Sequence, residues 1–129
     1  MRVRIPLVGL PSFEEEDKVM NRRLDFLTPE FQPGVNLTVR NGSKWADARP
    51  SDLLDVYKTG GAQPLFTAQV EEVIVTSRGT ITDADLVNEH SPKCTTVAGL
   101  SAAMEAAYGP NWGPEVVLLS FQIVDLVAL

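Results

Sequence analysis

The sequence of 129 residues has little cysteine and no long uninterrupted apolar run. Its single cysteine, Cys94, cannot form an internal disulfide, which is typical of proteins from a reducing compartment. The longest apolar segment covers residues 116–129, where Gln122 and Asp125 interrupt it, and it is shorter than the roughly 20 residues that a membrane helix needs. The first 16 residues turn acidic too early for a signal peptide. We therefore expect a cytoplasmic protein without membrane contact.

An excess of positive charge is also missing. Lysine and arginine number 11 against 17 acidic residues, which gives a net charge of -6. Such a chain repels a phosphate backbone at long range, so non-specific DNA binding is not expected. The hydrophobic share of 44% is that of an ordinary globular protein. At this length we expect a single domain over residues 1–129, with a core that needs no metal or disulfide.

Strong chemical motifs are absent. The sequence contains no phosphate loop, no CxxC pair and no HExxH. His90 and Cys94 stand four residues apart, but zinc usually takes four ligands, and Pro92 interrupts a helical spacing. A cysteine–histidine nucleophile would also need a third group to orient it. We expect no metal and no cofactor.

The hydrophobic pattern predicts more strands than helices. Period-two alternation and β-branched residues predict strands at 3–10, 24–28, 36–40, 52–58, 65–78 and 115–129, with a bend at Glu71-Glu72. Caps and helical spacing predict helices or helical turns from 12, from 29, at 83–90 and at 96–109. The strands are uneven, and strands and helices do not alternate regularly. The pattern favours an α+β fold whose mixed or antiparallel sheet curls into a small barrel with flanking helices.

A basic cluster interrupts this acidic chain. Arg40 and Lys44 lie close to Trp45, and Thr38 shares a strand face with Arg40. Arginine offers a planar fork to phosphates or base edges, and tryptophan stacks on bases. These properties predict a ligand site made of Thr38, Arg40, Asn41, Lys44 and Trp45. The alternative is a solvated hairpin whose tryptophan covers one end of the barrel. Trp112 is expected to plug a barrel end.

The ordered segments resemble a known family. "LDFLTPEFQPGVNLTVRNGSKWADARPSDLLDVY", "FTAQVEEVIV", "DLVNEHSPKC", "GLSAAMEAAYG" and "VVLLSFQIV" together resemble the ASCH domain, a branch of the PUA-like superfamily. The resemblance runs from Leu24 to Val124, and residues 1–23 lie outside it as an added N-terminal element. It implies a small PUA-like barrel with a cleft suited to RNA, nucleosides or modified bases.

Some members of this family are similar to small amidohydrolases that remove the acyl group of N4-acetylcytidine. Their motif lysine falls here on Val35, and their glutamate falls on Gln69, whereas Thr38 and Arg40 match the motif. Valine cannot take up a proton and glutamine has no useful pKa, so acid–base catalysis loses two of its groups. We therefore expect a non-catalytic binding module for RNA, a nucleotide or a modified nucleoside.

Three alternatives stay open. The chain could be an amidohydrolase with Thr38 as nucleophile, Glu71 as acid and base, and Lys44 as activator. It could be a ribonuclease, for which the sequence names no residues. It could also be an interaction module whose N-terminal element and C-terminal strand pair with another protein.

Overall fold

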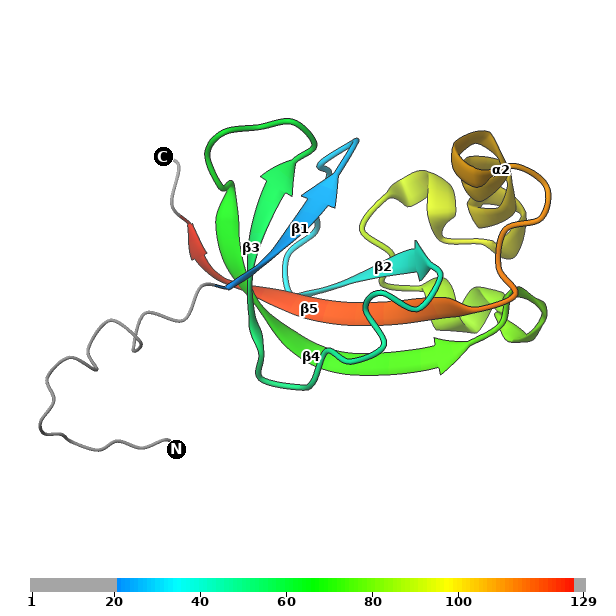
Figure 1. Cartoon of the computed structure of the whole chain (residues 1–129), viewed down its shortest axis with the longest axis horizontal. Coiled ribbons are helices and arrows are strands. Elements are labelled where there is room, and N and C mark those ends of the chain that lie inside the picture. The colour runs from blue at the N-terminus through cyan, green and yellow to red at the C-terminus, as the bar shows by residue number, and fades with distance from the viewer. Residues whose placement is uncertain (1–20, 127–129) are drawn as a thin grey trace, which may run out of the picture.

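A computed structural model describes residues 21–126 of the chain, with side chains to residue 124. Its regular structure consists of five strands, one α-helix and three short 3-10 helices (Figure 1). In chain order the elements are β1 (Arg22–Phe26), β2 (Val35–Asn41), β3 (Leu53–Lys58), β4 (Phe66–Thr76), the 3-10 helices η1 (Arg78–Thr80), η2 (Asp83–Leu86) and η3 (Pro92–Cys94), α2 (Val97–Tyr108) and β5 (Val116–Leu126). The predicted strand at 3–10 and the predicted helical turn from 12 lie outside the described residues.

The strands form one mixed sheet in the order β1-β3-β4-β5-β2. β1 and β3 are parallel, and the other neighbours are antiparallel. The long strands β4 and β5 bend where the register shifts between Thr67 and Ala68 and between Val70 and Glu72. This curls the sheet into a half-barrel. The α+β prediction is confirmed, and so is the predicted bend at Glu71-Glu72.

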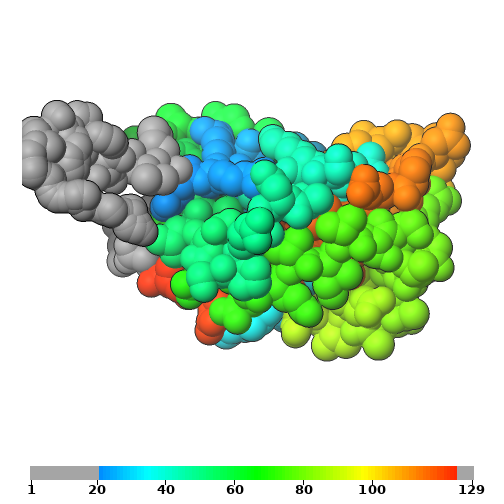
Figure 2. Space-filling view, turned by 60° about the horizontal axis from the view of Figure 1, so that its bottom comes forward, coloured from blue at the N-terminus to red at the C-terminus, as the bar shows by residue number. Residues whose placement is uncertain are grey.

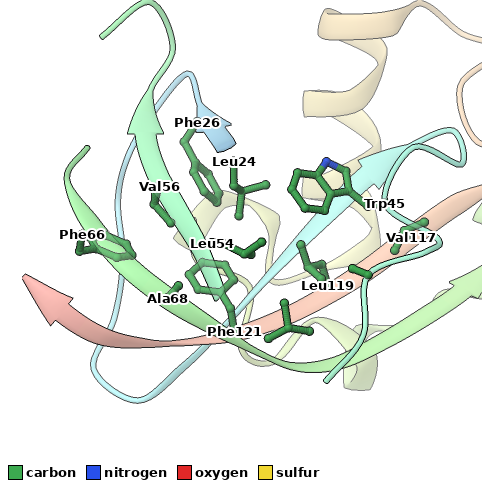
Figure 3. Close-up of a cluster of buried hydrophobic side chains, with 12 residues drawn as sticks. Leu24, Phe26, Trp45, Leu54, Val56, Phe66, Ala68, Val117, Leu119 and Phe121 are labelled. Atoms are coloured by element: carbon green, nitrogen blue, oxygen red, sulfur yellow. The ribbon is translucent and has the colours of Figure 1, made fainter. Parts of the chain in front are cut away.

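Alternation along the strands creates two cores, one on each face of the sheet. Val117, Leu119 and Phe121 of β5 pack inside the half-barrel with Trp45 (Figure 3). The neighbouring residues Val116 and Leu118 point to the other face and pack in a second cluster, below α2. Because residues 116–119 of β5 are buried on both faces of the sheet, this part of the strand is four hydrophobic residues in a row.

The helix α2 covers the second cluster with Leu100 and Met104, which are four residues apart and buried. Thr96 caps its start by accepting a hydrogen bond from the backbone N–H of Gly99 at 3.1 Å. Gly109 ends it with a φ of 88°, a value that favours glycine. No helix among residues 21–126 is long and apolar enough to cross a membrane.

Two predicted helical segments differ from the structure. The segment at 83–90 shortens to η2, which keeps the predicted capping box of Thr82 and Asp85. The segment from 29 is not helical. There the Asn36 side chain accepts from the backbone N–H of Gln32 at 2.9 Å and donates to its carbonyl at 2.8 Å. A side chain that bonds both backbone groups of Gln32 offers that residue an alternative to helical hydrogen bonds.

Candidate functional site

A cleft of about 470 Å³ lies where the half-barrel fails to close. Its walls come from β1 and β2, the two ends of the sheet order, which do not pair with each other in the described sheet. The segment 90–94 and the helix α2 complete it. The lining residues are Asp25, Phe26, Leu27, Thr28, Glu30, Thr38, Arg40, Thr59, His90, Ser91, Lys93, Cys94, Ala103 and Tyr108. The volume is in the range of pockets that hold small ligands.

Thr38 and Arg40 form the β2 wall. They are two residues apart on one strand, so both side chains point to the same side. The Nε of Arg40 donates to Thr38 Oγ1 at 3.1 Å, and its guanidinium carbon lies 4.6 Å from the centre of the Phe26 ring. Burial lowers the pKa of Arg40 from its ordinary value. Neither Nη atom has a hydrogen-bond acceptor among the described residues, so both remain for a ligand.

Glu89 lies behind this wall and is 4% exposed. The backbone around it runs along β2, with Leu37 N–H donating to the Asn88 carbonyl at 2.7 Å and His90 N–H donating to the Leu37 carbonyl at 2.9 Å. The Glu89 carboxylate accepts from the Ser91 N–H at 2.8 Å. Burial raises the pKa of Glu89 to about 7, although the Ser91 bond and the Arg40 charge favour the ionised form. Glu89 therefore changes its charge close to neutral pH.

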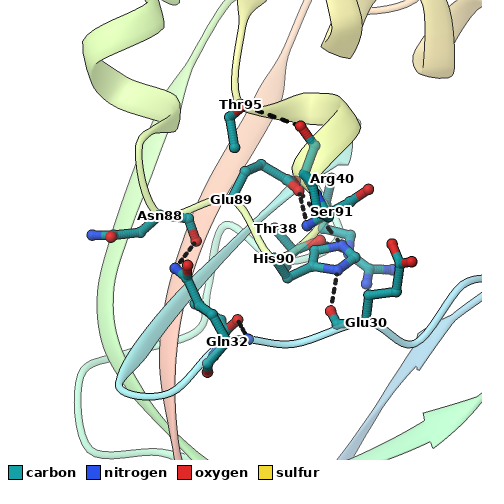
Figure 4. A network of polar contacts seen from close by, with 11 residues as sticks. Glu30, Gln32, Thr38, Arg40, Asn88, Glu89, His90, Ser91 and Thr95 are labelled. Atoms are coloured by element: carbon teal, nitrogen blue, oxygen red, sulfur yellow. Dashed lines mark hydrogen bonds and ion pairs between the residues drawn. The ribbon is translucent and has the colours of Figure 1, made fainter.

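His90 faces both a backbone carbonyl and Glu89 (Figure 4). Its Nδ1 lies 2.9 Å from the carbonyl oxygen of Glu30, and a carbonyl can only accept, so Nδ1 carries the hydrogen. Burial lowers the pKa of His90, which favours the neutral ring. Nε2 is then an acceptor, 3.8 Å from Glu89 Oε1. The ring also packs edge-on against Phe26, with 4.6 Å between centroids.

Cys94 and Lys93 close the cleft below α2. Burial raises the pKa of the Cys94 thiol, so it stays protonated and is a poor nucleophile. The structure places both Cys94 and His90 in the lining of this cleft, which the sequence did not predict. Within residues 21–126 no three histidine, cysteine, aspartate or glutamate side chains are grouped so that they could hold a metal ion.

Three of the five predicted ligand-binding residues do not line the cleft. Asn41 turns away, and its Oδ1 accepts from the Gly113 N–H at 2.9 Å. Lys44 is exposed on the loop 42–52. Trp45 is 4% exposed, packs in the first core cluster and lies below Arg22, whose guanidinium carbon is 4.0 Å from the ring centre. The predicted group is thus divided: Thr38 and Arg40 are in the cleft, and the others hold the fold together or face solvent.

The residues of the hydrolase alternative are not assembled either. Glu71 is exposed at the bulge of β4, outside the cleft that holds Thr38. Gln69 is paired with Leu53 and Gln122 within the sheet. Trp112, predicted to plug a barrel end, packs instead in the second cluster below Arg78. Thr38, Glu71 and Lys44 therefore do not line a common cleft in this structure.

Sequence reasoning missed the part that Glu89 plays. Its signal was a glutamate next to His90, within a segment predicted to be helical. The segment is extended there and forms a parallel bridge to Leu37, 52 residues earlier by subtraction of the residue numbers. A contact over such a separation leaves no local pattern in the sequence. The sequence therefore shows that Glu89 is next to His90 but not that Glu89 lies behind Arg40.

Comparison with known proteins identifies the fold. No family model matches the sequence, and no curated protein matches it significantly. The structure of an ASCH domain from Lactobacillus crispatus JV V101 is similar over 87% of this chain and 85% of that chain, with a TM-score of 0.58 and 11% identity. This chain has an ASCH-type fold. A DUF984 protein from Enterococcus faecalis V583 is similar over 92% of this chain and 90% of that one, with a TM-score of 0.53 and 11% identity.

The similarity agrees with the fold that the resemblance implied, a small barrel with flanking helices, although the sheet is a half-barrel and only one α-helix lies beside it. At 11% identity the likeness extends to the fold alone. What the cleft of this ASCH-like half-barrel binds has to be argued from its own residues.

Proposed function

We propose that this chain is a binding module whose cleft takes one nucleotide unit, as a nucleoside, a nucleotide or a single nucleotide of an RNA. The observation that carries the proposal is the half-buried guanidinium of Arg40. It lies against Phe26 and has both Nη atoms free of protein acceptors among the described residues. Such a fork binds the paired acceptors of a base edge or a phosphate.

The charges along the cleft favour a base over a polyphosphate. The lining contains two cationic side chains, Arg40 and Lys93, and two carboxylates, of which Asp25 also pairs with Arg23 at 2.7 Å. The positive charge of the lining is thus much lower than a polyphosphate would need. A base needs donors and acceptors together, and the cleft offers both. Arg40 Nη atoms can donate to a carbonyl or ring nitrogen, and the carboxylates can accept from an exocyclic amine. A phosphate is better placed near the exposed ammonium of Lys93.

The arrangement of the cleft supports a binding module over a hydrolase. Thr38 accepts from Arg40, and neither of the groups proposed to activate it, Glu71 and Lys44, lines the cleft. The resemblance to the ASCH family also supports a ligand of the nucleoside or RNA kind.

Calorimetric titration tests the proposal. The purified chain is titrated with nucleosides, nucleotides, N4-acetylcytidine and short single-stranded RNA. Arg40→Gln should weaken binding of the preferred ligand about tenfold to a hundredfold, because a charge-assisted bond contributes about 1.5–3 kcal/mol. Arg49→Gln removes the same charge from an exposed position outside the cleft and should leave affinity unchanged.

The titration can fail in two ways. No binding of any of these ligands would contradict the proposal. Equal losses in Arg40→Gln and Arg49→Gln would show diffuse attraction of charge in place of a site. Circular dichroism of both variants confirms that they are folded before the affinities are compared.

A further inference from the structure

β4 extends beyond its neighbour β3. The pairing of these strands ends where Leu53 lies opposite Gln69. The last backbone bonds on that side join Val70 to Ser51 and Asp52, both at 2.8 Å. From residue 71 to Thr76, β4 is paired with β5 on one side, and no described residue bonds to its backbone on the other. We call residues 71–76 the free edge.

The free edge is suited to pairing. Val73, Ile74, Val75 and Thr76 are all β-branched, and such residues favour strands. Ile74 and Val75 are 42% and 45% exposed, and they point to opposite faces of the sheet. Lysine or proline often protects an exposed edge, and residues 71–76 contain neither. A bulge, which also protects edges, lies at Glu71 where the free edge begins, and the pairing with β5 is regular from Glu72 to Thr76. Figure 2, in which the bottom of Figure 1 comes forward, shows this green part of the chain at the surface.

We propose that the free edge pairs with the free edge of a second copy of this chain, in antiparallel direction, with Val75 opposite Val75. A two-fold axis perpendicular to the sheet keeps each side chain on its own face, so one residue must lie opposite its own copy. A parallel arrangement would place Glu71 and Glu72 of the two copies side by side. The antiparallel arrangement separates them to opposite ends, which avoids this repulsion.

The charges select Val75 as the centre. With Val75 on the axis, Glu72 of each copy lies opposite Arg78 of the other, two residues beyond the end of β4. With Ile74 on the axis, Glu72 would lie opposite the uncharged Thr76. Arg78 uses its Nη1 for the carbonyls of Pro110 and Trp112, at 2.9 Å each. Its Nη2 has no acceptor among the described residues. The cleft between β1 and β2 stays open in this dimer, so the inference is independent of the proposed function.

Cysteine cross-linking tests the register. Residues directly opposite in antiparallel strands have Cα atoms about 4.5–5.5 Å apart, which a disulfide can bridge. Val75→Cys should therefore form a covalent dimer under mild oxidation, seen on a non-reducing gel. The matched control is Val87→Cys, which is 66% exposed and precedes Asn88, whose carbonyl accepts from Leu37 of β2. The native Cys94 is buried and should not cross-link.

Light scattering tests the dimer without a cross-link. The unmodified chain should approach twice its monomer mass as protein concentration rises, and Val75→Lys should stay monomeric. A monomer at every concentration would overturn the inference, and so would a dimer that Val75→Lys leaves intact. Cross-linking of Val75→Cys no faster than that of Val87→Cys would also overturn it. Neither experiment involves a ligand, so its failure says nothing of the cleft.

Discussion

The end of β2 and the loop that follows it contain the same kinds of residue, but their side chains lie in different parts of the molecule. Thr38 and Arg40 reach the cleft, whereas Lys44 faces solvent and Trp45 closes the core. β2 has backbone partners on both sides, β5 on one and residues 88–90 on the other. The loop is held by its own turn bonds and by Arg22, which bonds Asp47 at 2.8 Å and the Lys44 carbonyl at 3.0 Å. Closeness in sequence to a residue of the cleft is thus a poor guide to a position in the cleft once a strand has ended.

The largest effect should come from Trp45. Because this side chain fills the first core cluster, Trp45→Ala should lower the free energy of unfolding by about 3–5 kcal/mol. Trp45→Phe keeps much of the ring and should lose less. Urea unfolding of the two variants measures the difference. A loss below about 1 kcal/mol in Trp45→Ala would show that the loop does not anchor the core and would remove the contrast with β2.

A somewhat smaller effect concerns the pH dependence of stability. The pKa of Glu89 rises from 4.5 to about 7 on folding, so the folded protein holds this proton more tightly than the unfolded chain. The contribution of Glu89 is present at low pH and is lost as pH rises from 4.5 through about 7, by about 3 kcal/mol in all. Glutamine cannot ionise, so the free energy of unfolding of Glu89→Gln does not fall in this way. Between about pH 5 and pH 8 it should rise by roughly this amount relative to that of the unmodified chain.

Urea unfolding of both proteins at several pH values measures this change. The charged and titratable groups around Glu89 are Arg40, His90 and Cys94. The lowered pKa of His90 acts in the opposite direction, because stability from a neutral histidine is lost as pH falls through 6.5. Both proteins contain His90, so the difference between them isolates Glu89. Parallel pH profiles would contradict the prediction.

Asn41 should affect stability and leave ligand affinity unchanged. Its Oδ1 is the acceptor for the N–H of the buried Gly113, so Asn41→Ala should cost about 1–3 kcal/mol by leaving that group unpaired. Asn41→Asp keeps an oxygen there and should recover part of the loss. Unfolding curves, and titrations with the ligand proposed for the cleft, separate the two roles. A fall in affinity without a fall in stability would contradict this prediction and indicate that Asn41 contacts the ligand.

The smallest effect should come from Lys44. Because its side chain is exposed, Lys44→Ala should change stability by less than about 0.5 kcal/mol and should not change affinity. The sequence predicted a ligand contact here, so this variant measures how sharply the cleft is bounded. If Lys44→Ala binds as weakly as Arg40→Gln in the same titration, the loop must reach the cleft when ligand is present.

The sequence predicted the strands well because alternation is a local property. The strand at 36–40 and the bend at Glu71-Glu72 follow from period two and from a pair of charges within an apolar run. For the same reason Thr38 and Arg40 were correctly placed on one face. Trp45 and Glu89 could not be placed in this way, since the positions of both depend on residues far away in the chain.

The strand order has a consequence for the protein as it is being synthesised. In the described sheet, β2 joins the other strands through β5, which is the last strand to leave the ribosome. Until β5 is in place, the β2 wall of the cleft has no fixed position opposite β1. Arg40 itself is synthesised well before this, because β5 begins only at residue 116. A nascent chain should therefore be unable to bind the ligand that we propose for the cleft until β5 is in place.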